Sequence, residues 1–269
     1  MNVNPARPEV VDLAHEVGDI LIRKVADVDI GRLRQIEVRV TRLRDINATD
    51  PGYAEMVLFL CAAAEGNRSK LERAAREAVR LSNGNREIAA NAAVALCSIG
   101  NIDESTKLTQ QIFEKFPDDK IVLETAISNF QLALHFREAL SAWDAYERLA
   151  VNHRPKNLDR LRKIIVDSAE VIKLHGFTDS DLQHRLKVGI ASLRKQGFEV
   201  RRQSRLTFDD GTFISQLFIN ATPKVCAEMN FEIAYALLDA FEDPAASVFS
   251  IVCRPFSDAA GMQTLELTA

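Results

Sequence analysis

The stretch REIAANAAVALCSIGNIDESTKLTQQIFEKFPDD, residues 86–119, decides the fold, because its pattern recurs on both sides of it. Three frames, each about 34 residues after the last, begin at Gly52, Arg86 and Lys120. A chain that repeats itself at such a step builds the same unit several times and stacks each unit on its neighbour. The sequence therefore predicts a stacked array in the middle of this 269-residue chain.

The spacing of small residues in this frame has a known counterpart. Positions seven, eight, fifteen, twenty and thirty-two are occupied by Ala92, Ala93, Gly100, Ser105 and Pro117. This pattern resembles the tetratricopeptide repeat, a helix-turn-helix unit of about 34 residues. The resemblance implies an array of antiparallel helix hairpins over residues 51–155, in which small residues let neighbouring helices approach closely.

The other two frames follow the pattern with some departures. Gly66 falls on the turn position of Gly100, but the third frame has Leu134 where a glycine is expected. The aromatic residue that the repeat usually carries at its fourth position is missing from all three frames, which have Glu55, Ala89 and Leu123 there. An irregular helical bundle with the same spacing is the alternative interpretation.

Helices are also expected on both sides of the array. Residues 1–50 predict a helical pair (8–26 and 30–46) with apolar residues at helical spacing, and a terminal pair of this kind can cap an array. Residues 156–196 predict two longer helices that end the array.

Two helix starts are predicted by residue spacing. Ser69 with Glu72, and Thr178 with Asp181, have the spacing of a capping box, in which a hydroxyl and a carboxylate satisfy the first free amides of a helix. We therefore expect one helix to begin after Ser69 and another after Thr178.

Residues 197–256 change period and predict a small α+β unit whose family is not recognised. Alternating stretches at 198–208 and 212–220 flank a DDG hairpin turn, and a helix over 223–241 precedes a third strand over 247–256. The expected fold class is mainly α: a tetratricopeptide-like array of antiparallel helix hairpins, followed by an α-β-β-α-β C-terminal domain with a mainly antiparallel sheet.

The edges of this sheet and the last residues also carry expectations. Three strands leave two edges, each of which can pair with a second copy or with a partner's strand. Residues 257–269 are expected to form a weakly ordered tail.

Composition narrows the class of protein. No apolar run approaches the roughly 18 residues of a membrane helix, and the polar N-terminus does not resemble a secretory signal. The cysteines lack zinc-like spacing, so buried reduced thiols are favoured over two disulfides. These cysteines are Cys61, Cys97, Cys226 and Cys253. We expect a cytoplasmic protein without membrane contact.

Charge is unevenly distributed although the net charge is only −4. Residues 151–205 hold 13 Lys and Arg against 6 Asp and Glu, whereas residues 206–269 hold 2 against 9. The first segment predicts a basic surface that a solvated helix face explains better than a nucleic-acid site. Its candidate residues are Arg154, Lys156, Arg160, Arg194, Lys195, Arg201 and Arg202.

A survey for chemistry finds no phosphate-binding glycine loop, nucleophile elbow or paired metal-binding histidines. The best metal candidate joins Asp179, Asp181 and His184 with His175, but acids at a helix start are better explained as caps. An acidic group of Glu199 with the two aspartates of the DDG turn is better explained by turn geometry. We therefore expect no enzyme, no cofactor and no metal.

The resemblance also implies a partner-binding groove along the first helix of each repeat. The positions that face this groove in the family carry Tyr53, Met56, Leu60, Glu87, Ala90, Val94, Glu124, Ser128 and Gln131 here. None of them is one of the lysines and asparagines with which the family's best-known groove clamps a peptide carboxylate. The groove therefore suits an apolar helix, or it is filled by the chain itself.

The expected function is that of a non-catalytic scaffold, which binds another protein through the repeats or a C-terminal sheet edge. The C-terminal domain is also expected to allow homo-oligomers. The alternatives are an immunity-type inhibitor of a toxin or enzyme, whose acidic end imitates nucleic acid, and a nucleic-acid-binding regulator. The sequence leaves the identity of the partner open.

Overall fold

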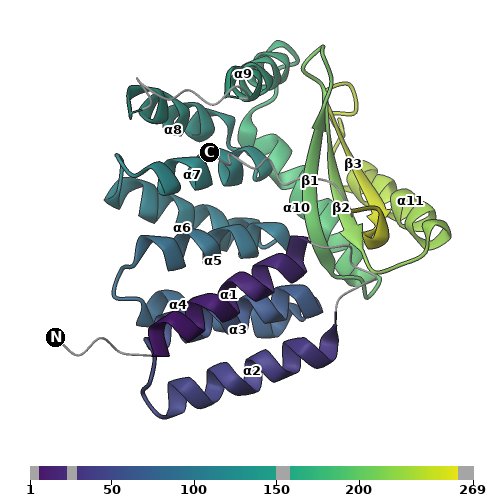
Figure 1. Ribbon diagram of the computed structural model, residues 1–269. Coiled ribbons are helices and arrows are strands. Elements are labelled where there is room, and N and C mark those ends of the chain that lie inside the picture. Colours follow the sequence, from purple (N-terminus) through teal and green to yellow (C-terminus); the bar gives the residue numbers. More distant parts are fainter. Residues whose placement is uncertain (1–5, 23–28, 150–157, 260–269) are drawn as a thin grey trace.

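The structure is a computed structural model that describes residues 6–22, 29–149 and 158–259. These ranges contain eleven α-helices and three strands, so the protein is mainly α with a small α+β part at its C-terminal end (Figure 1). The helices of the array and its flanks are α1 (Ala6–Ile22), α2 (Ile30–Asp45), α3 (Pro51–Glu65), α4 (Arg68–Leu81), α5 (Arg86–Ser98), α6 (Ile102–Lys115), α7 (Lys120–Leu132), α8 (Phe136–Leu149), α9 (Leu158–Leu174) and α10 (Asp179–Lys195).

The helices from α3 to α8 pack as neighbouring pairs at the predicted step. The second helices of the three pairs begin at Arg68, Ile102 and Phe136, each 34 residues after the last. The first helices begin at Pro51, Arg86 and Lys120, and their amides are capped by the side chains of Asp50, Asn85 and Asp119. The helical array predicted from the spacing is thus confirmed.

The turn inside each pair has the same backbone conformation, including the pair that lacks glycine. Gly66 and Gly100 both have φ of 70°, and Leu134 has φ of 61°. This left-handed region costs a residue with a side chain about 1 kcal/mol. Leu134 is fully buried, so packing of its side chain offsets that cost. The repeat therefore keeps its geometry at a position where the sequence departs from it.

Of the two predicted capping boxes, one is confirmed and one is wrong. Thr178 and Asp181 form both bonds of the box at the start of α10. The helix α4, however, begins before Ser69, and Asn67 caps it by accepting from the amide of Lys70 at 3.1 Å. Glu72 is thereby free to bind side chains outside its own helix. The box failed because Asn67, two residues earlier, is an equally strong cap.

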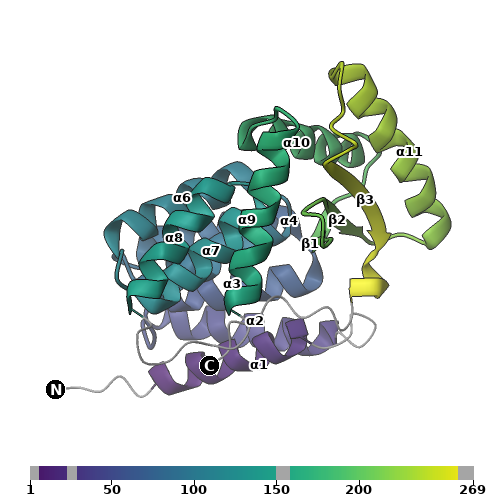
Figure 2. The same cartoon turned by 90° about the horizontal axis from the view of Figure 1, so that it is seen from above.

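The first two helices cover the first repeat. Their buried residues, among them Val17 and Ile36, share one apolar cluster with Val57 and Cys61 of α3. Figure 2 shows α1 on the side of the array opposite α6 and α8, with the first helices of the repeats between them. The pair thus ends the array at its N-terminal side.

The sheet consists of β1 (Val200–Thr207), β2 (Phe213–Ile219) and β3 (Phe249–Pro255), in that spatial order. The strands β1 and β2 are antiparallel, but β2 and β3 are parallel, so the expectation of a mainly antiparallel sheet was wrong. The reason is α11 (Pro223–Ala240), which crosses over between β2 and β3.

One hydrophobic core joins the last repeat to the sheet. It runs from Phe130 and Trp143 through α9 and α10 to Phe213 and Cys253. The inner face of the sheet packs closely on α10, because a Cβ at Gly189 would lie 2.8 Å from Cδ1 of Ile251. The predicted tail begins with a short 3-10 helix at Phe256–Ala259, and the rest of it lies outside the described residues.

Candidate interaction surfaces

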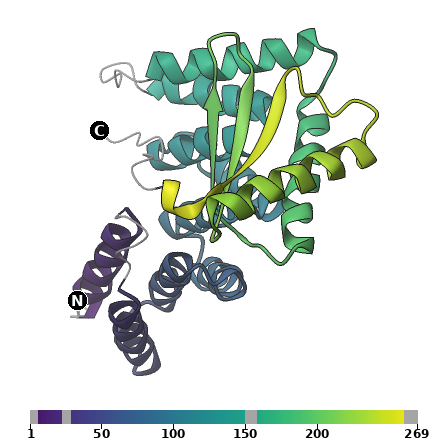
Figure 3. The same cartoon turned by 90° about the vertical axis from the view of Figure 1, so that its right-hand side faces the viewer.

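The α+β part is attached to the repeats through the carbonyl ends of the first helices. The carbonyls of Ala64, Gln131 and Leu132 lie at the ends of α3 and α7 and carry the negative end of the helix dipole, so they favour cationic and amide donors, and that of Gly100 lies in the turn after α5. Donors from β1 and α10 reach them, and Figure 3 shows the sheet in front of the array. The four bonds join Arg201 Nη2 to Ala64 O (3.2 Å), Arg194 Nη2 to Gly100 O (3.2 Å), Gln203 Nε2 to Leu132 O (2.8 Å) and Arg205 Nη1 to Gln131 O (3.4 Å).

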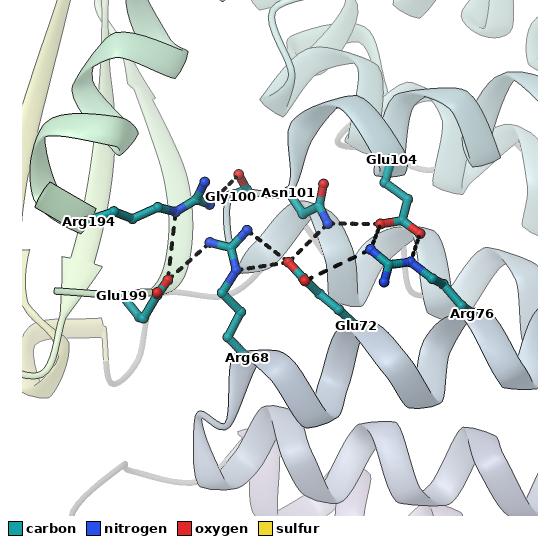
Figure 4. Close-up of polar contacts among 8 residues, drawn as sticks. All are labelled: Arg68, Glu72, Arg76, Gly100, Asn101, Glu104, Arg194 and Glu199. Carbon is teal, nitrogen blue, oxygen red and sulfur yellow. Dashed lines mark hydrogen bonds and ion pairs between the residues drawn. The ribbon is translucent and has the colours of Figure 1, made fainter. Parts of the chain in front are cut away.

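A row of charged side chains strengthens this attachment (Figure 4). Glu199, in the loop before β1, links Arg194 of α10 to Arg68 of α4, and the row continues along the first two repeats. Its contacts are Arg194 Nε–Glu199 Oε2 (3.7 Å), Arg68 Nη1–Glu199 Oε2 (3.0 Å), Arg68 Nη2–Glu72 Oε1 (2.8 Å), Asn101 Nδ2–Glu72 Oε1 (3.1 Å), Asn101 Nδ2–Glu104 Oε2 (3.0 Å) and Arg76 Nε–Glu104 Oε1 (2.6 Å). Three arginines thus face three glutamates, and this balance fits a clamp better than an anion site.

Most of the described residues of the predicted basic surface are used inside the molecule. Arg194 and Arg201 bind the carbonyls above, and Arg202 donates to the carbonyl of Ala259 at 3.1 Å. Burial lowers the pKa of all three guanidinium groups. Arg160 and Lys195 are exposed, while the predicted Arg154 and Lys156 lie outside the described residues. The charge count could not show that Arg194 and Arg201 bond to carbonyls of the array.

Arg205 belongs to the same attachment and was missed by the sequence analysis. Its guanidinium group lies 4.8 Å from the ring centre of Phe136 and 5.4 Å from that of Phe213. Burial lowers its pKa to about 9. The signal that could have found it is the alternation of Arg201, Gln203 and Arg205, which places all three on one face of the strand.

The residues of the predicted groove lie in different environments. Tyr53 and Glu87, which are one repeat apart, are hydrogen-bonded, with the hydroxyl donating to Oε2 at 3.0 Å. Three are buried by neighbouring elements, two are exposed, and the remainder are half-buried. The buried ones are Met56, Ala90 and Gln131, the exposed ones Glu87 and Val94, and the half-buried ones Tyr53, Leu60, Glu124 and Ser128. The chain itself therefore fills part of this face.

Glu124 is held by a residue of the second helix of its own repeat. The hydroxyl of Tyr146 donates to Oε1 of Glu124 at 3.0 Å. Burial, together with this carboxylate, raises the pKa of Tyr146 to about 12, and burial raises the pKa of Glu124. This bond joins α7 to α8 and explains why Glu124 is not free for a partner.

The residues considered for metal binding are caps and local contacts. Asp179 accepts from the amide of Arg137 at 3.2 Å and so caps α8, and Asp181 caps its own helix. His184 contacts the ring of Phe241, and His175 faces Ser247. In the described parts of the chain, no three such side chains are grouped as metal ligands would be.

The acidic group considered at the hairpin is also dispersed. Asp210 accepts from the amide of Thr212 at 2.9 Å within the turn, whereas Glu199 belongs to the charged row. The four cysteines are free and buried, as expected. Burial raises the pKa of the thiols of Cys61 and Cys97 to about 12.

The outer edge of β3 is closed at its centre. The carboxamide of Asn230, on α11, accepts from the amide of Cys253 at 2.6 Å and donates to the carbonyl of the same residue at 3.3 Å. One side chain thus makes the two bonds that an added strand would make at this residue. This contact disfavours strand addition as the mode of binding at β3.

The outer face of α11 carries three exposed large apolar side chains, more than any other helix among the described residues. Phe231, Tyr235 and Leu238 are 66%, 62% and 60% exposed. They lie at positions i, i+4 and i+7, so they form one stripe, which we call the α11 stripe. The sequence analysis predicted a helix over 223–241 but no exposed apolar stripe on it. The helical periodicity of this segment also places the residues of the α11 stripe on one face, and this signal was overlooked.

A cleft of about 670 Å³ lies at the other end of the molecule, between α2, α3 and α4. Leu58 and Ala74 contribute apolar surface to it, and Arg44, Arg73 and Arg80 are among the basic residues that line it. Arg44 is paired with Glu55 and Arg80 with Glu77, whereas Arg73 is exposed. We call this the α2–α4 cleft.

No helix in the described ranges combines the length and apolar character needed to cross a membrane. The chain matches no protein-family model, no curated protein and no solved structure.

Proposed function

We propose that the protein is a non-catalytic protein-interaction module built on a tetratricopeptide-like array. The observation that carries this proposal is the α11 stripe, in which Phe231, Tyr235 and Leu238 are each more than half exposed. Contiguous large apolar side chains on a protein surface mark sites where another molecule binds. A stripe at i, i+4 and i+7 fits recognition of a helix or of an apolar groove.

The rest of the molecule supports this assignment by holding α11 in place. The inner side of the helix is buried through Met229, Ile233 and Leu237, and Asn230 ties it to β3. The attachment of β1 to the helix ends and the charged row fix the sheet on the array. A surface that is rigid before binding loses little conformational entropy when the partner arrives.

Site-specific photo-crosslinking tests the proposal. A photoreactive phenylalanine analogue in place of Tyr235 is expected to capture a protein in the native cell, and one in place of Leu174 serves as the control. Leu174 is 82% exposed and belongs to another helix, α9. Equal capture from both positions, or none from either, would contradict a binding role for α11.

A further inference from the structure

We infer that the α11 stripe of one copy docks in the α2–α4 cleft of a second copy, head to tail. The inference rests on the proposed function, because it names the partner of the same stripe. It depends on three properties of the two surfaces: their charge, their shape and their positions on the molecule.

The two surfaces carry opposite charge. The residues that line the α2–α4 cleft include five Arg and Lys against three acids, a net formal charge of +2. The helix α11 holds Lys224 against Glu228, Glu232 and Asp239, and Glu242 and Asp243 follow it directly. Complementary charge favours this pairing and accelerates encounter.

The shapes of the two surfaces are also complementary, because one is a ridge and the other a hollow. The stripe is a ridge of three large side chains, and the exposed Ala227 and Ala234 lie beside it on the same helix face. Small residues there leave room for another helix to approach closely. The cleft is a hollow of about 670 Å³ with apolar surface from Leu58 and Ala74, so the ridge can bury apolar area against it. Acids beside the ridge would then face Arg73 and its neighbours at the rim.

The two surfaces lie on separate parts of the molecule, so one copy cannot satisfy both. In Figures 1 and 3, α11 lies on the outer side of the sheet, whereas α2 lies at the far end of the array. A second copy must therefore supply the complementary surface. Such a contact is heterologous, since each added copy leaves one stripe and one cleft open, and assembly grows with concentration.

Pairing of two α11 helices with each other is the competing dimer. That arrangement would bring the acids of both helices together, because each contributes Glu228, Glu232 and Asp239 against one lysine. Repulsion between like charges disfavours it. The charge of the cleft thus decides between the two arrangements.

Sedimentation equilibrium of the full chain gives the first test. The weight-average mass is expected to rise with concentration at low salt and to fall when salt is added, because salt screens exposed charges. A monomer at every concentration up to the solubility limit would overturn the inference. Capture of another protein by the Tyr235 crosslinker would then still support the proposed function, so the two can fail separately.

Mixing two variants gives the sharper test. A stripe variant carries Phe231→Ser with Leu238→Ser, and a cleft variant carries Arg73→Glu with Thr41→Trp, a half-buried position that lines the cleft. Each alone should associate at least about tenfold more weakly than the parent. Mixed, they should form a 1:1 dimer, because one keeps an intact cleft and the other an intact stripe.

The outcomes distinguish the arrangements. Association of the stripe variant at the parent level, or a mixture that stays monomeric, would overturn head-to-tail pairing. A control variant with Arg160→Glu and Leu174→Ser changes exposed residues on α9 and should associate like the parent. Circular dichroism and urea midpoints close to those of the parent confirm that each variant is folded.

Discussion

At the residue scale, the turn glycines of the repeats also make room for the α+β part. A Cβ built at Gly66 would lie 1.7 Å from Cζ of Arg201, and one at Gly100 would lie 3.1 Å from Cδ1 of Ile190. The same residues have the positive φ that the turn requires. Glycine is thus needed at these positions for two reasons. The backbone has a positive φ, and a side chain from the α+β part packs directly over the Cα atom.

We predict that Gly66→Ala destabilises the protein more than Gly176→Ala does. Gly176 has φ of 76° with nothing within 4 Å of the added Cβ, so its variant should cost only the backbone strain of about 1 kcal/mol. Gly66→Ala also displaces Arg201 from the carbonyl of Ala64, which should add about 1.5–3 kcal/mol. Urea unfolding measures both, and the excess should disappear in an Arg201→Ala background. If Gly66→Ala lowered the free energy of unfolding equally in the wild-type protein and in the Arg201→Ala variant, the close contact between Gly66 and Arg201 would be contradicted.

A second prediction concerns the thiol of Cys97, whose pKa burial raises from 9.0 to about 12. The unfolded chain loses this proton above about pH 9 while the native protein keeps it, so stability should fall as pH rises from 9 toward 12. In urea unfolding, the parent should lose about 1 kcal/mol more than Cys97→Ala between pH 8 and pH 10. A difference between the two proteins that does not change with pH would show that the thiol ionises equally in both states.

At the element scale, sequence periodicity predicted most helices and strands, but it did not predict which of them pack against each other. The helix starts at Pro51, Arg86 and Lys120 follow from spacing, because local capping and packing act within each repeat. The parallel pairing of β3 was missed, although the helix expected between the second and third strands is the connection that parallel neighbours need. A similar limit explains the basic surface, because the bonds of Arg194 and Arg201 to carbonyls of the array are known only once α10 and β1 are placed against it.

The closed edge of β3 makes a prediction for Asn230→Ala. Loss of the carboxamide leaves the amide and carbonyl of Cys253 without their bonds and should cost about 1–3 kcal/mol. Amide hydrogen exchange at Cys253 should accelerate, and the variant should aggregate more readily through the opened edge. The exposed Asn220→Ala serves as the control. Unchanged exchange at Cys253 would show that α11 protects this edge by some other contact.

At the scale of the whole molecule, one core and one charged row join the repeats to the sheet. The predicted boundary at residue 197 falls inside this shared core, which extends from Cys97 to Cys253. The sequence shows where the helical period gives way to the alternation of strands, but it does not show which apolar faces of helices and strands pack together. Prediction of the candidate site from sequence is limited in the same way. Helical periodicity places the residues of the α11 stripe on one face, but it does not show how far the stripe lies from the cleft.

We therefore predict a single cooperative unfolding transition for the last repeat and the sheet. Trp143, the only tryptophan, is buried in the shared core and reports on it by fluorescence. Its midpoint in urea should coincide with that of hydrogen exchange in β2, because neither part can lose the core alone. Midpoints that differ between the two probes would indicate that the sheet unfolds independently.

The strand that bonds the helix ends also limits how long the array can become. Eight residues at about 3.3 Å each give β1 a reach of about 26 Å, comparable to the span of three helices spaced about 10 Å apart. Duplication of one more 34-residue unit would carry the new helix end beyond the last donor on the strand. We therefore expect an array with a fourth hairpin to need a longer β1, because the donors of this strand sit at fixed positions along it.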